Sequence, residues 1–128
     1  MTGEGHSYLK AVVLVGVGGF AGAGLRYAVS ASLASPLGTL AVNVVGSFLL
    51  GVVMYESIHI GFVSRESRYV VSTGFLSSLT TYSTFGVETF TQPTVTYTVA
   101  NFGANYVLGL TAVYLGRELI LRTTRCDR

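Results

Sequence analysis

The 128-residue sequence predicts an all-α membrane protein with four transmembrane helices. Half of its residues are hydrophobic, 11% are charged, and the mean hydropathy is +0.58, whereas a soluble domain carries about 25% charged residues. Four apolar stretches are each long enough to cross a bilayer, which takes about 20 helical residues. Because little chain remains outside these stretches, we expect residues 1–128 to form a single four-helix transmembrane domain.

The first two crossings are predicted at about residues 9–33 and 37–60, separated by a Ser35-Pro36 turn. Glycines fill the first crossing, and Gly18 and Gly22 form a small-xxx-small face that permits close approach of another helix. Arg26 lies in the later part of this crossing. Its position inside an apolar segment makes it a candidate functional residue.

The third crossing, at about residues 69–90, contains the hydroxyl-rich run TGFLSSLTTYSTFGVET between Thr73 and Thr89. Residues of this kind compete for backbone hydrogen bonds, so we expect the helix to be broken near the membrane centre. Irregular backbone at that depth must be buried in protein, line a cavity or hold an ion. Freed carbonyl oxygens suit a small cation such as Na⁺, and two chains meeting there would complete its coordination.

The fourth crossing, at about residues 95–121, follows a Gln92-Pro93 break. Four crossings bring seven of the eight cationic residues to one side of the membrane: Lys10, Arg65, Arg68, Arg117, Arg122, Arg125 and Arg128. By the positive-inside rule, both termini are expected in the cytoplasm. These cations flank apolar segments without interleaved exposed aromatics, so no nucleic-acid partner is expected.

Polar residues inside the crossings form two faces at helical spacing. Thr81, Phe85 and Glu88 share one face of the third crossing, while Asn101 and Asn105 share a face of the fourth. Hydroxyls, amides and the positive edges of aromatic rings can replace the water that a small anion loses in a narrow path. The alternative is that the Asn, Ser and Thr residues only hold helices together.

These residues carry a resemblance to a known family. The stretch from Leu37 to Gly46, LGTLAVNVVG, and the run from Thr73 to Thr89 resemble the two signature stretches of the Fluc fluoride channels, also called the CrcB family. The segment GAGLRY, which contains Arg26, is similar to the arginine motif of the family's first helix. The resemblance covers all four crossings.

The resemblance implies a fluoride-specific channel in the cell membrane, built as an antiparallel dimer with two pores and one structural Na⁺ at its centre. The backbone carbonyls of Ser77 and Thr80 match the Na⁺ ligands. The implied fluoride pore positions are Asn43, Tyr82, Phe85, Thr81, Ser83, Thr84, Glu88, Asn101, Asn105 and Arg26. Arg26 would raise the local anion concentration, cap a loop or pair with Glu88.

Three features depart from the family pattern. Tyr82 stands where Phe is common, Ser77-Ser78 replaces a usual Gly-Gly, and the cations are strongly biased to one side. Since such bias fixes orientation, we expect this chain to pair with an oppositely oriented paralogous subunit rather than with itself.

The implied activity is passive export of fluoride from the cytoplasm, which reduces fluoride toxicity. Three alternatives compete with it. A small multidrug-type proton antiporter needs an embedded carboxylate, for which Glu88 is the sole candidate. An intramembrane enzyme needs a nucleophile with a base, and neither His6 nor His59 has a Ser or Cys partner at a suitable spacing. The third alternative is a structural assembly subunit, which would not require the hydroxyl-rich run of the third crossing.

Overall fold

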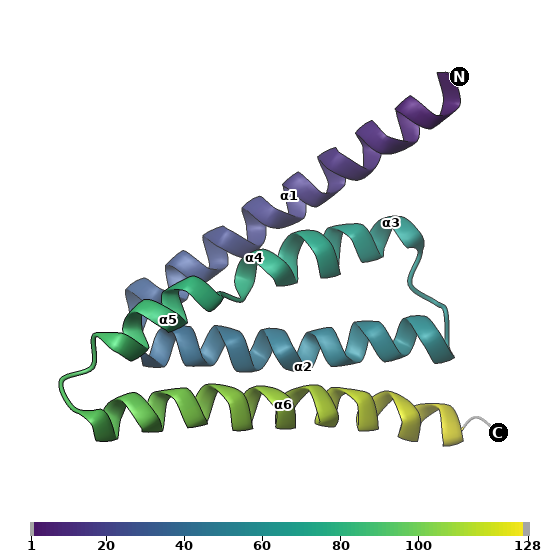
Figure 1. The fold of residues 1–128 in the computed structure, drawn as a ribbon. Coiled ribbons are helices and arrows are strands. Elements are labelled where there is room, and N and C mark those ends of the chain that lie inside the picture. The colour runs from purple at the N-terminus through teal and green to yellow at the C-terminus, as the bar shows by residue number, and fades with distance from the viewer. Residues whose placement is uncertain (1, 127–128) are drawn as a thin grey trace.

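A computed structural model describes residues 2–126, in which every regular element is helical (Figure 1). Two long helices come first, α1 (Thr2–Ser32) and α2 (Leu37–His59). The third pass contains four short segments: α3 (Arg65–Arg68), the π-helical η1 (Tyr69–Leu76), α4 (Ser77–Leu79) and α5 (Tyr82–Phe90). The long helix α6 (Val95–Cys126) completes the chain.

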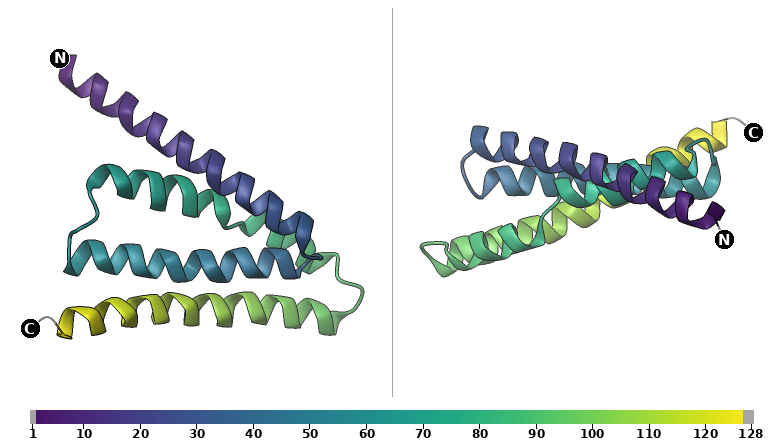
Figure 2. Two further views of the ribbon diagram at one scale, coloured as in Figure 1. Left: turned by 180° about the vertical axis from the view of Figure 1, so that it is seen from behind. Right: turned by 90° about the horizontal axis from the view of Figure 1, so that it is seen from above.

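The four passes lie side by side, with the third pass between α1 and α2, and α6 on the other side of α2 (Figure 1). The closest pairs are α2 with α6 and α1 with η1. A small buried core of Val42, Leu76 and Leu79 joins α2 to the third pass. Seen from above, α5 and the first part of α6 turn away from the plane of the other passes (Figure 2).

The predicted all-α membrane fold is confirmed. Two segments of the described chain are both long and apolar enough to cross a membrane, His6–Ser32 with 27 residues and Leu37–His59 with 23. Helix bounds agree closely with the predicted crossings at Leu37, Phe90 and Val95. The outer ends differ, since α1 begins at Thr2 rather than near residue 9 and α6 continues to Cys126 rather than ending near residue 121.

Glycines allow α1 and η1 to pack with their backbones in contact. A Cβ atom added at Gly18 would lie 2.2 Å from the carbonyl oxygen of Val70, and one at Gly22 would lie 2.2 Å from that of Phe75. Since real Cβ atoms do not approach backbone this closely, only glycine fits at these two positions. The predicted small-xxx-small packing face is therefore confirmed, and its partner is η1.

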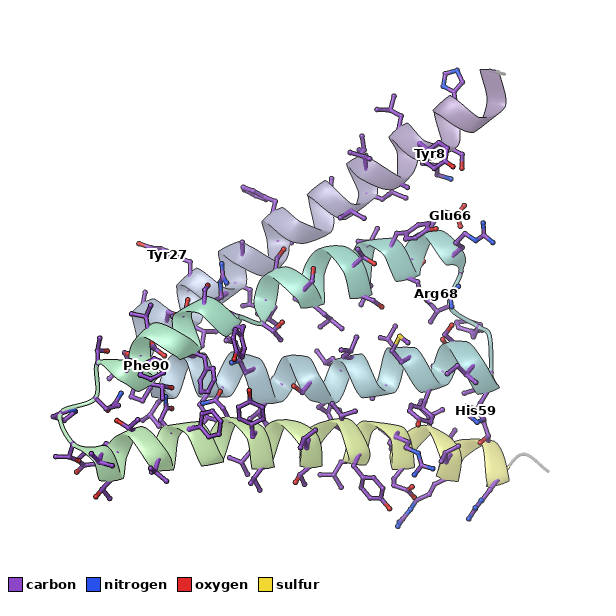
Figure 3. The ribbon with its side chains drawn as sticks, in the orientation of Figure 1. Tyr8, Tyr27, His59, Glu66, Arg68 and Phe90 are labelled. Atoms are coloured by element: carbon purple, nitrogen blue, oxygen red, sulfur yellow. The ribbon has the colours of Figure 1, made fainter. Side chains whose placement is uncertain are left out.

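The cationic residues of the described chain other than Arg26 gather at one end of the molecule. Lys10 near the start of α1 lies 3.4 Å from Glu66 of α3, while the guanidinium of Arg117 lies 5.4 Å from the ring centre of Tyr55 near the end of α2. Figure 3 shows Glu66, Arg68 and His59 at this same end, with Tyr27 and Phe90 toward the other. Arg128 lies outside the described residues.

Candidate functional site

A cleft of about 450 Å³ lies where the middle of α2 and of α6 faces the third pass. Its lining is mostly polar or aromatic: Asn43, Gly46, Ser47, Leu50, Ser72, Leu76, Ser77, Thr80, Thr81, Tyr82, Phe85, Asn105 and Tyr106. Seven of the twelve residues predicted to form the site line it. The hydrogen bonds inside the cleft show how the chain forms the interruption between α4 and α5.

The chain leaves helical geometry at Thr80 and Thr81, whose ψ angles are 154° and 125°. In a continuous helix the Thr81 N–H would donate to the carbonyl of Ser77 four residues earlier. It donates instead to Asn43 Oδ1 at 2.8 Å, and Asn43 Nδ2 donates back to the Thr81 carbonyl at 3.1 Å. The Asn43 side chain therefore replaces a helical turn as the hydrogen-bonding partner of Thr81.

Thr81 also begins α5 as its N-cap. Its Oγ1 accepts a hydrogen bond from the Thr84 N–H at 3.2 Å, the usual role of threonine at this position. In a continuous helix that N–H would donate to the carbonyl of Thr80. The carbonyls of Ser77 and Thr80 thus both lose their helical donors.

These two carbonyls are the ones expected to bind Na⁺. Hard oxygen ligands released from a helical hydrogen-bond pattern fit a small cation in their chemistry. The neighbouring hydroxyls leave this role to the backbone, because Ser77 Oγ donates to the Thr73 carbonyl and Thr80 Oγ1 donates to the Leu76 carbonyl.

A row of side-chain amides connects α2, α6 and α5. Asn43 Nδ2 donates to Asn105 Oδ1 at 3.2 Å, and Asn105 Nδ2 donates to Asn101 Oδ1 at 3.2 Å. Asn101, which is 8% exposed, donates to Thr89 Oγ1 at 2.8 Å. The Thr89 hydroxyl in turn donates to the Phe85 carbonyl at 2.7 Å. The predicted Asn101 and Asn105 face is therefore joined to the cleft.

Aromatic rings form the part of the cleft next to these amides. The Phe85 ring is 5% exposed and lies 6.1 Å from the ring of Tyr106 in an edge-to-face arrangement. It also lies 6.2 Å from Phe102 and 5.8 Å from Tyr82. Tyr82 is 75% exposed, so its ring lies at the margin of the cleft while Phe85 lies inside it.

The hydroxyl residues among the implied pore positions of α5 and its N-cap divide into a buried and an exposed part. Thr81 is 7% exposed, whereas Ser83 and Thr84 are exposed on the outer side of α5. Thr84 contacts the site through its bonds with Thr81, including a 3.0 Å contact between the two hydroxyls. Ser83 has a weaker 3.5 Å contact with the same hydroxyl.

Glu88 and Arg26 lie away from the cleft lining. Glu88 Oε1 accepts a hydrogen bond from Ser35 Oγ at 2.6 Å, which ties α5 to the turn between α1 and α2. Its Oε2 is buried with no partner within the part of the chain that the structure describes. Arg26 is half-buried, and the ion pairs of the described residues do not include a pair with Glu88.

Sequence reasoning missed four polar or aromatic contributors to this region: Ser47, Ser72, Thr89 and Tyr106. Ser47 follows Asn43 by one helical turn, and Tyr106 directly follows Asn105. The spacing of Ser47 was a usable signal, since residues four apart share a helix face. Tyr106 gave no such signal because aromatic residues occur throughout apolar helices.

Comparison with known proteins decides the family. Residues 13–117 match the family described as CrcB-like protein, Camphor Resistance (CrcB). The chain belongs to the CrcB family. A CrcB relative from Haloarcula marismortui, named fluoride-specific ion channel FluC 1, is 49% identical over 112 residues, which cover 88% of this chain and 87% of the relative.

Methanosarcina acetivorans has two relatives of this kind, named fluoride-specific ion channels FluC 1 and FluC 2. Its FluC 1 is 42% identical over 114 residues, covering 83% of this chain and 87% of the relative. Its FluC 2 is 40% identical over 109 residues, covering 85% of this chain and 86% of the relative. These relatives are named as ion channels, and the family is one of channels rather than enzymes.

Proposed function

We propose that this membrane protein is a fluoride-specific channel that conducts F⁻ passively out of the cytoplasm. The single observation that carries the proposal is the cleft in which the Asn43 amide, the Thr81 hydroxyl and the buried Phe85 ring lie together. Amide and hydroxyl hydrogens and aromatic ring edges supply positive groups that can replace water around a small anion. The names of the CrcB relatives support fluoride as that anion.

Export needs no chemical step on the ion. Hydrofluoric acid that crosses the membrane dissociates at neutral pH, and the resulting fluoride then leaves down its electrochemical gradient. An inside-negative potential contributes about 2.3 kcal/mol per charge per 100 mV to this outward movement. Removal of fluoride from the cytoplasm is what would reduce its toxicity.

We infer that the working unit is an antiparallel dimer with a structural Na⁺ between its two subunits. The redirected N–H groups of Thr81 and Thr84 support this, because they leave the Ser77 and Thr80 carbonyls available as ligands. Bound there, Na⁺ would hold the two broken passes together by its charge. The site requires both subunits, since one chain supplies only part of a coordination shell.

A paralogous subunit of opposite orientation is the proposed partner, with both termini of this chain in the cytoplasm. The gathering of cations at one end of the molecule supports a fixed orientation. The two numbered relatives in one organism support a paired arrangement. Epitope tags at the C-terminus should be found on the cytoplasmic face only, and tags on both faces would contradict this proposal.

Fluoride efflux from liposomes tests the function. We expect the purified chain combined with its paralogue to release fluoride, and Phe85→Ile to abolish release without changing assembly on gel filtration. Val87→Ile is the matched control because Val87 lies on the same helix with an exposed side chain. Unchanged efflux in Phe85→Ile would favour the structural-subunit alternative. No efflux with any pairing would refute the channel.

A further inference from the structure

A second cleft, of about 480 Å³, opens at the end of the molecule where the cationic residues gather. It lies between the end of α2 and the start of the third pass, and it is lined by Met54, Arg65, Arg68, Tyr69, Ser72 and Thr73. Figure 3 shows Arg68 at this end of the bundle, below Glu66. None of these six residues was predicted to take part in the pore.

The charged side chains that line this cleft are both cationic. Its lining contains two guanidinium groups and no carboxylate. Two acidic residues adjoin this end but do not line the cleft. Glu66 contacts Lys10 at 3.4 Å and also attracts Arg65 by its charge. Glu56 Oε1 accepts the backbone N–H groups of Phe62 and Val63, while its Oε2 has no partner among the described residues. Arginine offers only hydrogen-bond donors and stays charged, so such a cleft attracts anions.

Ser72 connects this cleft to the larger one, because it lines both. Its Oγ atom is buried with no hydrogen-bond partner in the described part of the chain. A helical serine usually donates to the carbonyl four residues earlier, as Ser77 does to Thr73. Ser72 lies in the π-helical η1 and makes no such bond. A buried hydroxyl without a partner is costly unless it serves a ligand.

We propose that the cleft formed by Arg65 and Arg68 captures a small monovalent anion and that the Ser72 hydroxyl passes it to the cleft of Asn43. The proposal rests on the proposed function, in which that anion is fluoride. Arg68 is held in place by its Nη1 donating to Ser57 Oγ, while Arg65 is exposed. Arg65 is therefore the group that meets the arriving anion, and Ser72 is the donor that receives it.

Binding is measured first by the ¹⁹F line width of fluoride added to protein in nanodiscs. The wild type is expected to broaden the line, and Arg65→Gln and Ser72→Ala to reduce the excess broadening by about threefold or more. Ser72→Thr keeps the hydroxyl and is expected to restore the broadening. Equal broadening in the wild type, Arg65→Gln and Ser72→Ala would overturn the proposal.

Transport is measured second, as initial fluoride efflux at low and high ionic strength. Screening extends over about 30 Å at 10 mM salt and about 3 Å at 1 M. A charged cleft raises association rates by about tenfold or more at low salt. Arg65→Gln is therefore expected to lower efflux by about threefold to tenfold at 10 mM and by less than twofold at 1 M.

Arg122→Gln is the matched control, because it removes the same charge from an exposed position on α6 outside both clefts. Its efflux should equal that of the wild type at both ionic strengths. An equal loss in Arg65→Gln and Arg122→Gln would show a general charge or orientation effect and overturn the proposal. Fluoride binding that needs Arg65, without any wild-type efflux, would refute the proposed function and leave the anion cleft standing.

Discussion

Replacement of Asn43 by alanine removes the contact that shapes the interruption between α4 and α5. The change deletes three hydrogen bonds, two with the backbone of Thr81 and one with Asn105. Side-chain hydrogen bonds between membrane helices contribute about 0.6 kcal/mol each on average, which gives about 2 kcal/mol for three. Thr81 is 7% exposed, so an unpaired N–H or C=O there adds about 1–3 kcal/mol. We expect Asn43→Ala to lower the free energy of unfolding by about 3–5 kcal/mol, the sum of these two contributions.

Reversible unfolding in detergent mixtures, followed by helical circular dichroism, measures this loss. Ser47→Ala is the control, because Ser47 lies one turn further along α2 and lines the same cleft. It is expected to change stability by less than about 0.5 kcal/mol, as is usual when no partner is lost. If Asn43→Ala were as stable as Ser47→Ala, the conclusion that Asn43 holds Thr81 in its extended conformation would be wrong.

Three further changes test the packing of α1 on the third pass, the loop between α2 and α3, and the cationic end of the molecule. Gly22→Ala should destabilise the protein by about 1–3 kcal/mol through overpacking, whereas Gly24→Ala, with open space around it, should be neutral or stabilising in thermal unfolding. Glu56→Ala should cost about 2 kcal/mol in chemical unfolding because two backbone N–H groups lose their acceptor, and a value near zero would contradict this. A backbone hydrogen bond at Glu66 and the hydrogen bond and charge of Lys10 hold the pKa of Glu66 below its ordinary value of 4.5. The contribution of Glu66 to the free energy of unfolding should therefore be present above pH 4.5 and lost as the pH falls below it. Glu66→Gln should remove this pH dependence of stability.

The long elements could be predicted from the sequence because apolar length and proline position fix where a crossing begins and ends. Leu37 and Val95 begin helices next to the two proline-containing turns, as expected. The early start of α1 was missed because hydropathy reports the apolar span of a helix and not its full length. The residues that precede the span include Gly3 and Gly5 but no proline, and the helix continues through them.

The site could be predicted as a set of residues but not as an arrangement. Asn43 and Thr81 are 38 positions apart, and their contact depends on how α2 crosses the third pass. No local pattern gives that crossing. The π-helical geometry of η1, which packs closely against the glycines of α1, was also not predicted from the sequence. Ser72 lies in this π-helical segment, lines both clefts, and has no hydrogen-bond partner for its Oγ among the described residues.

Reversal potential in a planar bilayer tests the central claim most directly. With a tenfold fluoride gradient and equal chloride on both sides, a passive fluoride-selective channel gives a potential of about 59 mV toward the fluoride equilibrium value. The account predicts this value with the chain and its partner subunit, unchanged by a pH gradient. A potential near zero would contradict selectivity for fluoride, and a potential that follows the pH gradient would indicate proton coupling.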